Sequence, residues 1–315
     1  MTPTVDVCML TYNHAAFVQQ AIESVLAQQT NFLVRLVIGD DGSTDETRAL
    51  ITEYAQRQPA RFKLLFHERN VGIIPNFVQV LESCEAPFVA VLDGDDYWTD
   101  SHKLQQQVDF LQAHAEFSVS AHDAEMFWQD GSTPPTPFST TKPALQQGRQ
   151  EFTHTDVVRN GWFLPTASLV FRRALIQKLP AWFRTVFSGD YSLLLLLSEA
   201  GKVHYTPQMM ARYRIHARGA SFITHRNEMQ VMAKMVGENQ AFRDHFSSAH
   251  HAHFTDLIGT LQFRLGTGSL KQGSYGDWAK HWRVAMGTDW RVFIRNLTRL
   301  LHTTVTKNRQ RPTPR

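Results

Sequence analysis

Acidic residues gather in two short segments of the sequence. Asp93-Gly94-Asp95-Asp96 follows the apolar run Phe88–Leu92, and Asp40-Asp41-Gly42 follows the apolar run Leu33–Ile38. Several carboxylates in one turn repel one another unless a cation neutralises them. A hard cation such as Mg²⁺ takes oxygen ligands, and it typically bridges one or two carboxylates to substrate phosphates. The pair Asp93-x-Asp95 suits that chemistry, although a solvated acidic turn has the same sequence pattern.

The second acidic turn leads into a predicted helix. Ser43 and Glu46 have the spacing of a capping box, which predicts that a helix begins there. Asp45 is expected to cap this helix, where the positive end of the helix dipole favours an acid. Asp40 and Asp41 precede the helix. They either accept hydrogen bonds from a base or ribose, or only shape the turn.

The elements that must position these turns alternate along the first hundred residues. Apolar, β-prone runs predict strands at Val5–Leu10, Leu33–Ile38, Phe62–Phe66 and Phe88–Leu92. Helices are expected between them, at 18–26, from Ser43, and at about 75–83. This order predicts right-handed βαβ units and a mainly parallel sheet with helices on both faces. Since ligands bind beyond the carboxyl ends of such strands, both acidic turns should face one crevice.

The second half of the chain is less regular. Strands are expected at Phe117–Phe127, Ala167–Phe171, Val203–Tyr205 and Met209–Ile215, a loop at Gln129–Gln150, and a helix at Asp190–Glu199 with Gly201 as its C-cap. From about Arg226 the pattern is helical. We therefore expect an α/β domain over residues 1–225, with halves of about 1–100 and 101–225, and a helical C-terminal region over 226–315.

Composition fits a protein without a membrane-spanning segment. The chain is 43% hydrophobic and 19% charged, and its apolar stretches are far shorter than the roughly 20 residues that span a bilayer. The first residues lack the basic segment of a signal peptide. The two cysteines, Cys8 and Cys84, lie in apolar runs. Buried, reduced thiols predict a cytoplasmic location.

Positive charge is concentrated near the C-terminus. Residues 281–315 hold eight Lys/Arg and one acid, a balance of +7, and because the whole chain carries +3, the remainder carries −4. A predicted amphipathic helix there has a basic stripe, Arg291, Arg295 and Arg299, beside the apolar residues Trp290, Phe293, Ile294, Leu297, Leu300 and Leu301. It either lies on an anionic membrane surface or packs on the α/β domain with its arginines solvated. Lys307–Arg315 is expected to be a disordered tail, and no nucleic-acid-binding motif accompanies the charge.

Five ordered segments resemble the inverting family 2 glycosyltransferases with a GT-A fold. They are Val7-Cys-Met-Leu-Thr-Tyr-Asn13, Ala21-Ile-Glu-Ser-Val-Leu-Ala-Gln28, Asp40-Asp-Gly-Ser-Thr-Asp45, Asn70-Val-Gly72 and Leu92-Asp-Gly-Asp-Asp-Tyr-Trp98. The likeness returns at Ser188-Gly-Asp190 and Tyr213-Arg-Ile-His216, and it ends near Ser221. The resemblance implies a Rossmann-like α/β fold. It also implies transfer of a sugar from a nucleotide diphosphate to an acceptor hydroxyl, in bacterial cell-surface polysaccharide or glycan synthesis.

The same resemblance implies roles for individual residues of the donor half. Thr11 and Tyr12 would line the nucleobase pocket, Asp40 or Asp41 would bind uracil or ribose, and Asp93 would contact the ribose or sugar; Asn13 and Asn70 belong to the same donor-binding segments. Asp95, with Asp96, would hold Mg²⁺ or Mn²⁺ on the diphosphate, and His216 would complete the metal site. A UDP-sugar is the expected donor.

The acceptor half would supply the catalytic base. Asp190 stands where the family places its base, although the family pattern Glu-Asp is Gly-Asp in this chain. Trp162, Thr166 and Ser168 stand where related enzymes approach the acceptor, here a glycan or a lipid-linked glycan. Contact with the inner face of the plasma membrane would suit such an acceptor.

Two other functions are compatible with parts of the pattern. A sugar nucleotidyltransferase would share a similar fold, but it normally has a Gly-rich loop where this chain has Thr11-Tyr-Asn-His14. An inactive nucleotide- or carbohydrate-binding module is disfavoured because Asp93, Asp95 and Asp190 are all present.

Overall fold

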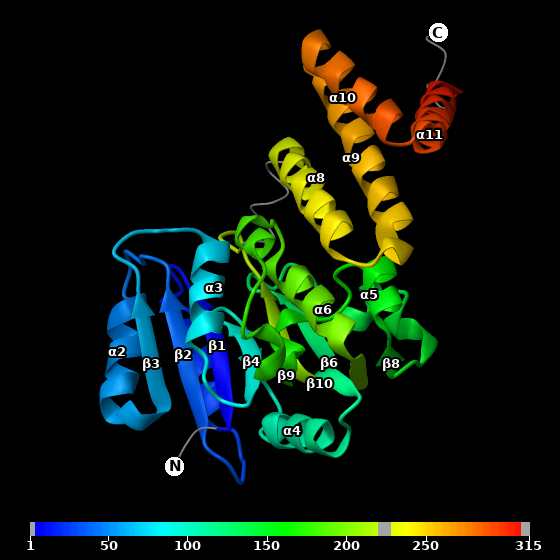
Figure 1. Ribbon diagram of the computed structural model, residues 1–315. Helices are drawn as coiled ribbons and strands as arrows, with labels where there is room; N and C mark the ends of the chain where they lie inside the picture. Colours follow the sequence, from blue (N-terminus) through cyan, green and yellow to red (C-terminus); the bar gives the residue numbers. More distant parts are fainter. Residues whose placement is uncertain (1–3, 220–227, 310–315) are drawn as a thin grey trace. The chain divides into compact units, whose positions relative to one another are not determined.

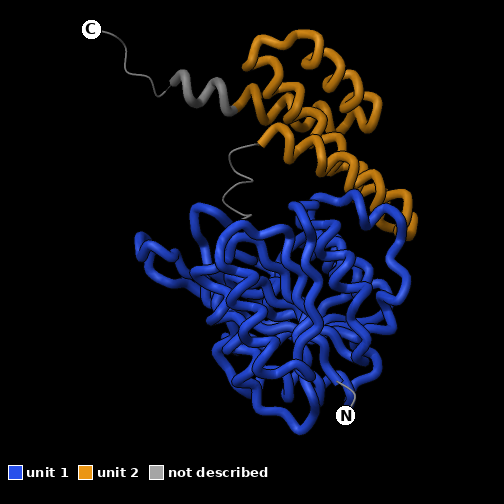
Figure 2. Tube along the Cα trace, turned by 90° about the vertical axis from the view of Figure 1, so that its left-hand side faces the viewer, with its two compact units in different colours: residues 1–222 blue, residues 223–315 orange. Residues whose placement is uncertain are grey.

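The computed structural model describes residues 4–219 and 228–309, with side chains up to His302 (Figure 1). Chain contacts divide the protein into two compact units, Met1–Phe222 and Ile223–Arg315, coloured separately in Figure 2. The domain boundary expected between residues 225 and 226 lies outside the described residues.

The first unit is built on one sheet of ten strands, most of them parallel. Along the sheet the order is β3 (Phe62–Phe66), β2 (Val34–Asp40), β1 (Val5–Thr11), β4 (Phe88–Asp93), β9 (Val170–Arg172), β6 (Phe117–Trp128), β10 (Lys202–Ile215) and β5 (Tyr97–Trp98), with β7 (Thr136–Pro137) on β6 and β8 (Glu151–Phe152) on β10. Strand β9 runs antiparallel to both β4 and β6, so β1, β2, β3, β4, β6 and β10 all point the same way. Their carboxyl ends therefore meet at one edge.

The burial of the central strands explains why their sequences are apolar. Strands β1 and β4 are buried along nearly their whole length, as expected of parallel strands covered on both faces. Asp6 in β1 is a buried exception. Its carboxylate accepts hydrogen bonds from Arg35 Nε at 2.8 Å and from the Ala86 N–H at 2.9 Å, which offset the cost of burying the charge.

Within the described residues, six α-helices of the first unit surround this sheet. They are α1 (Val18–Leu26), α2 (Thr47–Arg57), α3 (Ile73–Ser83), α4 (Lys103–Ala113), α5 (His154–Asn160) and α6 (Gly189–Ala200). Helix α3 packs on β1 and β2, while α4 and α6 contact β6. In Figure 1, α3 and α6 lie in front of the sheet. The mixed α/β architecture expected from the sequence, with a mainly parallel sheet, is confirmed.

Several local expectations need correction. The capping box is wrong: α2 begins at Thr47, and the Ser43 hydroxyl donates to Asp40 instead. Asp45 does cap the helix start, because it accepts the Thr47 N–H at 3.0 Å. The two extended segments expected at 203–205 and 209–215 form one strand, β10, interrupted by bulges. Helices α4 and α5 had not been expected.

The second unit is helical throughout its described residues, apart from turns. Its helices are α8 (Glu228–His245), α9 (His251–Lys271), α10 (Tyr275–Thr288) and α11 (Trp290–Arg309). One apolar cluster joins α8 to α9, and a second, formed by Phe263, Ala285 and Phe293, joins α9, α10 and α11. Helix α11 continues to Arg309, so the first residues of the expected disordered tail are helical, and residues 310–315 lie outside the described range. None of the helices within the described residues is long and apolar enough to cross a membrane.

Candidate active site

The loops beyond the parallel strands carry most of the residues singled out in the sequence. The β1–α1 loop holds Asn13 and His14, β2 ends at Asp40, and the turn after β4 holds Asp95. His216 directly follows β10. Because these strands are parallel, their loops lie at the same edge of the sheet.

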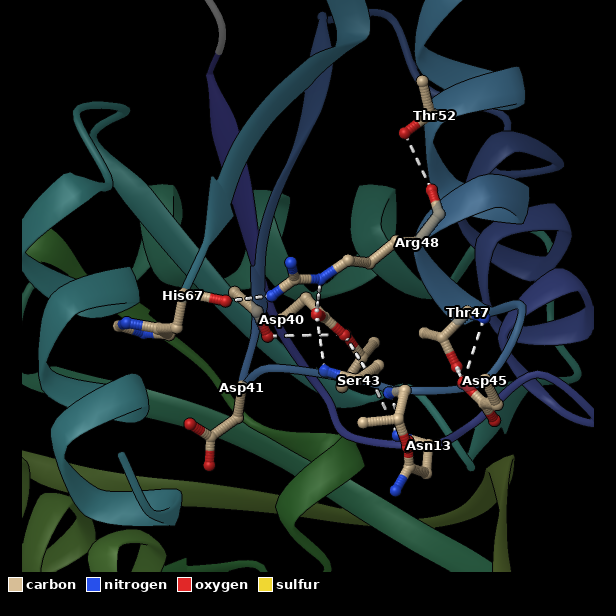
Figure 3. Close-up of polar contacts among 12 residues, drawn as sticks. Asn13, Asp40, Asp41, Ser43, Asp45, Thr47, Arg48, Thr52 and His67 are labelled. Carbon is tan, nitrogen blue, oxygen red and sulfur yellow. Dashed lines mark hydrogen bonds and ion pairs between the residues drawn. The ribbon is translucent and has the colours of Figure 1, made fainter. Parts of the chain in front are cut away.

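The first two loops are locked together by Asn13 (Figure 3). Its backbone has a φ of 54°, a left-handed conformation that asparagine tolerates better than most residues. The Asn13 N–H donates to Ser43 Oγ at 2.9 Å, and Asn13 Oδ1 accepts from the Thr44 N–H at 2.9 Å. Asn13 therefore fixes the conformation of the loop that contains Tyr12 and His14.

Asp40 supports the loops from inside. The residue is fully buried, and its carboxylate accepts from Thr11 Oγ1 at 3.1 Å, from the Ser43 N–H at 3.0 Å and from Arg48. Thr11 is likewise buried. In this structure the polar atoms of Asp40 and Thr11 are enclosed and bonded to protein. Contact of Thr11, and of Asp40 or Asp41, with a nucleotide stays a prediction.

Asp41 organises the neighbouring β3–α3 loop. Its carboxylate accepts from the Val71 N–H at 2.6 Å and from the Gly72 N–H at 3.0 Å, and it points away from the Asp40 cluster in Figure 3. Gly42 has a φ of 75°, and a Cβ there would lie 2.5 Å from the backbone nitrogen of Asn70. Only glycine allows this approach. Asn70 itself is exposed on the loop.

Exposed apolar side chains lie at the same edge. Tyr12 follows β1 and is 43% exposed, and Phe66 ends β3 and is 40% exposed. Val71 and Ile73, from the β3–α3 loop, are also exposed. Flat or branched apolar surface suits a nucleobase, which can stack on aromatic faces. Thr11 and Tyr12 are the two residues predicted to line a nucleobase pocket. Of these, Tyr12 has the exposed side chain in this structure.

Two histidines meet Asp95. His216 Nε2 lies 3.0 Å from Asp95 Oδ2, and His14 Nε2 lies 3.6 Å from the same oxygen. Burial alone would raise the pKa of Asp95, but the hydrogen bond from His216 and the charges of both histidines outweigh it and lower that pKa. Burial lowers the pKa of His14, which favours a neutral ring. Among the described residues, nothing hydrogen-bonds the buried Nδ1 of His14.

At the two neighbouring carboxylates, Asp93 and Asp96, burial is the largest influence on the pKa. Burial, followed by the charges of Asp95 and Asp190, raises the pKa of Asp93 to about 8. Burial and the charges of Asp95 and Asp93 also raise the pKa of Asp96. This site is therefore short of positive charge.

The Asp96 side chain bonds to the backbone of β10. Its Oδ1 accepts from the Arg214 N–H at 2.8 Å, and the residue is only 3% exposed. Arg214 Nε donates to the Asp95 carbonyl at 2.7 Å, so the turn after β4 is tied to β10. In this structure the Asp96 carboxylate is enclosed on Arg214, and a metal shared by Asp95 and Asp96 stays a prediction.

The side chains around Asp95 fit a divalent cation that is bound together with a phosphate ligand. Among the described residues, no three His, Cys, Asp or Glu side chains already surround one point. Mg²⁺ sites commonly use one or two carboxylates and complete their coordination with waters and substrate phosphates. Asp95 and His216 match that pattern, and the imidazole nitrogen suits Mn²⁺ better than the oxygen-seeking Mg²⁺.

Asp190 faces this group from the start of α6. Its carboxylate accepts from Thr166 Oγ1 at 2.8 Å, from Ser188 Oγ at 2.7 Å and from the Tyr191 N–H at 2.8 Å. Since the charge of Asp190 acts on Asp93, both carboxylates belong to one site.

Steric crowding explains why glycine, Gly189, precedes Asp190. A Cβ at Gly189 would lie 2.8 Å from Phe77 Cδ1 on α3. The start of α6 therefore packs too closely on α3 for the glutamate that is usual in the family.

An aromatic and basic cluster, formed by Phe138, Lys142 and Trp162, lies near Asp190. Lys142 Nζ stands 4.4 Å from the centre of the Trp162 ring, and the Phe138 ring centre is 5.1 Å from that of Trp162. Burial lowers the pKa of Lys142, and the charge of Asp190 opposes that shift. Lys142 is therefore close to the predicted base. Its loop position gave no signal in the sequence.

Ser168 is not part of this cluster. It is fully buried, and its hydroxyl donates to the Pro165 carbonyl at 2.6 Å. Thr166 and Trp162 are partly exposed, and Thr166 contacts Asp190. Acceptor contact by Trp162, Thr166 and Ser168 stays a prediction.

His14 and Arg214 were also missed as site residues. Both signals were present, since His14 follows the Thr11-Tyr12-Asn13 segment and Arg214 precedes His216 by two positions.

A mainly parallel sheet with an Asp–His group at its carboxyl edge and a second carboxylate at a facing helix start defines a GT-A-type glycosyltransferase. The profile of the glycosyl transferase family 2 matches residues 6–173, over half of the chain. The chain belongs to this family.

Curated relatives align with different shares of this chain and of their own length. An uncharacterized glycosyltransferase of Nostoc sp. is 30% identical over 269 residues, 82% of this chain and 81% of that protein. An uncharacterized protein of Mycobacterium tuberculosis is 34% identical over 215 residues, 68% of this chain but only 59% of that protein. The putative teichuronic acid biosynthesis glycosyltransferase TuaG of Bacillus subtilis is 30% identical over 131 residues, 41% of this chain and 50% of TuaG.

Solved structures share the fold. Staphylococcus aureus TarS 1–349 in complex with UDP-GlcNAc superimposes with a TM-score of 0.61 at 17% identity, over 92% of this chain and 82% of that one. The mannosyltransferase PcManGT from Pyrobaculum calidifontis, in complex with GDP-Man and Mn²⁺, gives a TM-score of 0.57 at 14% identity, over 97% and 81%.

Proposed function

We propose that this glycosyltransferase is metal-dependent and inverting, and that it moves a sugar from UDP to a hydroxyl of a cell-surface glycan or a lipid-linked glycan. The observation that carries the proposal is the common site of Asp190 and of the charged group around Asp93 and Asp95. TarS with UDP-GlcNAc supports the donor class, and TuaG supports the pathway class. A cytoplasmic location belongs to the same proposal.

In this proposal the donor lies along the edge formed by β1, β2 and β4. Tyr12 and Phe66 offer exposed rings for the base. Asn13 and Asp41 hold the two loops that flank it, through hydrogen bonds to Ser43, Thr44, Val71 and Gly72. Asp93 and Asp95 then meet the ribose, sugar and diphosphate end.

Asp95 and His216 would hold Mn²⁺ or Mg²⁺, which stabilises the charge that develops on a departing nucleotide diphosphate. His14 adds a neutral nitrogen beside them. PcManGT, which binds GDP-Man with Mn²⁺, supports the metal assignment.

Asp190 would act as the general base. It accepts the proton of the acceptor hydroxyl as that oxygen forms a bond to the anomeric carbon, and the bond from that carbon to the diphosphate oxygen breaks on the opposite face. The configuration at the carbon inverts. Hydrogen bonds from Thr166, Ser188 and the Tyr191 N–H hold the carboxylate of the base in position.

Two substitutions separate these roles. Asp190→Asn should lower turnover by about 10²–10⁴-fold, the usual size of general-base catalysis, while donor affinity stays unchanged. Asp95→Ala should weaken Mn²⁺-dependent donor binding itself. Calorimetry gives the affinities and release of UDP gives the turnover. Near-normal turnover of Asp190→Asn would show that the base lies elsewhere.

A further inference from the structure

Helix α11 has one buried face. Val292 and Phe293 are buried, and Leu297 and Leu300 pack partly buried against the same apolar cluster as Phe263. This face accounts for part of the apolar pattern seen in the sequence. It joins α11 to α9 and α10 within the second unit.

The side of α11 next to this buried face exposes a strip of large apolar side chains. Trp290 is 62% exposed, Ile294 48% and Leu301 59%. Their spacing places them on one side of a helix with 3.6 residues per turn. Exposed side chains of this size, following one another along three turns, leave apolar surface that the packing of the unit does not use.

Basic side chains run beside this strip. Arg291, Arg295 and Arg299 are exposed, and Arg295, Thr298, Arg299 and His302 line an open depression of about 460 Å³. Arg295 is paired with Asp256 at 2.8 Å, through Oδ1 of that carboxylate. Residues 281–315 carry a balance of +7 in a chain whose remainder is negative. The strip and the stripe together form a surface that we call the α11 face.

An anionic bilayer fits this surface better than other partners. A second copy would bring two strongly basic surfaces together, which like charges oppose. A nucleic acid would match the arginines but leave Trp290 and Ile294 in water. The boundary between lipid headgroups and acyl chains accepts both kinds of group, and tryptophan is enriched there.

We propose that the α11 face docks this protein on the surface of an anionic phospholipid bilayer. The helix lies parallel to the membrane, with Trp290, Ile294 and Leu301 at the acyl boundary and the arginines among the headgroup phosphates. The docking is peripheral, and it is independent of how the catalytic site works. It would bring the enzyme to acceptors that are held in the membrane.

Vesicle sedimentation of the full chain tests the proposal. The protein should sediment with vesicles of phosphatidylcholine and phosphatidylglycerol, and much less with phosphatidylcholine alone. Added salt should weaken the binding because it screens the arginines. The double variant Trp290→Ala/Ile294→Ser should bind the anionic vesicles roughly tenfold more weakly or worse, since it removes two side chains from the interface.

Matched controls keep the test specific. Met209→Ser removes an apolar side chain of similar exposure, 48%, from the first unit, and it should bind vesicles like the unmodified protein. The helical content of the double variant, followed by circular dichroism, should be unchanged, which shows that the helical second unit is folded. Absence of vesicle binding, equal binding by the double variant, or a self-association in solution that the double variant abolishes would each overturn the proposal.

Discussion

Asp95 illustrates how single residues balance charge in this site. The carboxylate is surrounded by acids, and its ionised form depends on contacts with His216 at 3.0 Å and His14 at 3.6 Å. Asp96 accepts a hydrogen bond from the Arg214 N–H, but burial still raises the pKa of both Asp93 and Asp96. A cation that arrives with the donor would relieve this repulsion. Metal binding and donor binding should therefore be cooperative.

His216→Ala tests the metal side of this arrangement. Loss of a residue that binds or orients a metal ligand typically lowers metal affinity by about 10–100-fold, and we expect that loss in the Mn²⁺-dependent part of donor affinity. Calorimetric titration with the nucleotide, with and without Mn²⁺, measures it. The exposed His102→Gln serves as the control. Equal metal dependence in both variants would remove His216 from the site.

Gly189 makes a steric prediction at the same scale. In Gly189→Ala the new Cβ meets Phe77 at 2.8 Å, and such overpacking typically costs about 1–3 kcal/mol. Because Asp190 follows directly, turnover should fall as well. Gly237→Ala on α8 is the matched control, since its Cβ meets nothing within 4 Å, and a helical Gly→Ala change stabilises by about 0.5–1 kcal/mol. Urea unfolding compares the two. Equal stability of both variants would contradict the packing argument.

At the scale of elements, the first four strands were predictable because their sequences are apolar runs. Buried parallel strands are continuous apolar runs, so β1 to β4 were placed within one or two residues. Placing acids after two of them was enough to predict a shared edge. Loop contents were harder, because side-chain contacts such as those of Asp40 and Asp41 decide whether an acid meets a ligand or supports a turn. The sequence pattern does not contain that difference.

The long loop after β6 shows the same limit. It was expected only as a loop, yet it carries Lys142 to the Trp162 ring near Asp190. Lys142→Met keeps the apolar part of the contact and removes the charge. We expect turnover to fall by roughly tenfold, as for one partly screened charge near the reaction centre, with donor affinity unchanged. Steady-state kinetics with Lys142→Arg as the conservative control measures this. Full activity of Lys142→Met would exclude a role for the charge.

At the scale of the whole molecule, all residues proposed for catalysis belong to the first unit, and the second unit contributes helices with their own cores. The family profile ends at residue 173, so family resemblance offered no guide to the second unit. There, only helical periodicity and charge were informative. Periodicity also overstated the α11 core, because Trp290, Ile294 and Leu301 share the pattern with buried residues but are exposed.

Relatives differ in how much of their own length this chain covers. The chain spans 59% of the mycobacterial relative but 81% of the Nostoc one. Substrates of these proteins therefore do not transfer to this chain by similarity alone, and the donor must be measured directly.

Calorimetric titration of the full chain with UDP, dTDP and GDP, each with Mn²⁺ and with EDTA, tests the central claim most directly. The account predicts that UDP binds tightly, that EDTA abolishes the binding, and that Mn²⁺ alone binds weakly because the phosphates complete its coordination. Binding of no nucleotide, or binding that is equally tight in EDTA, would contradict the proposed metal-dependent donor site.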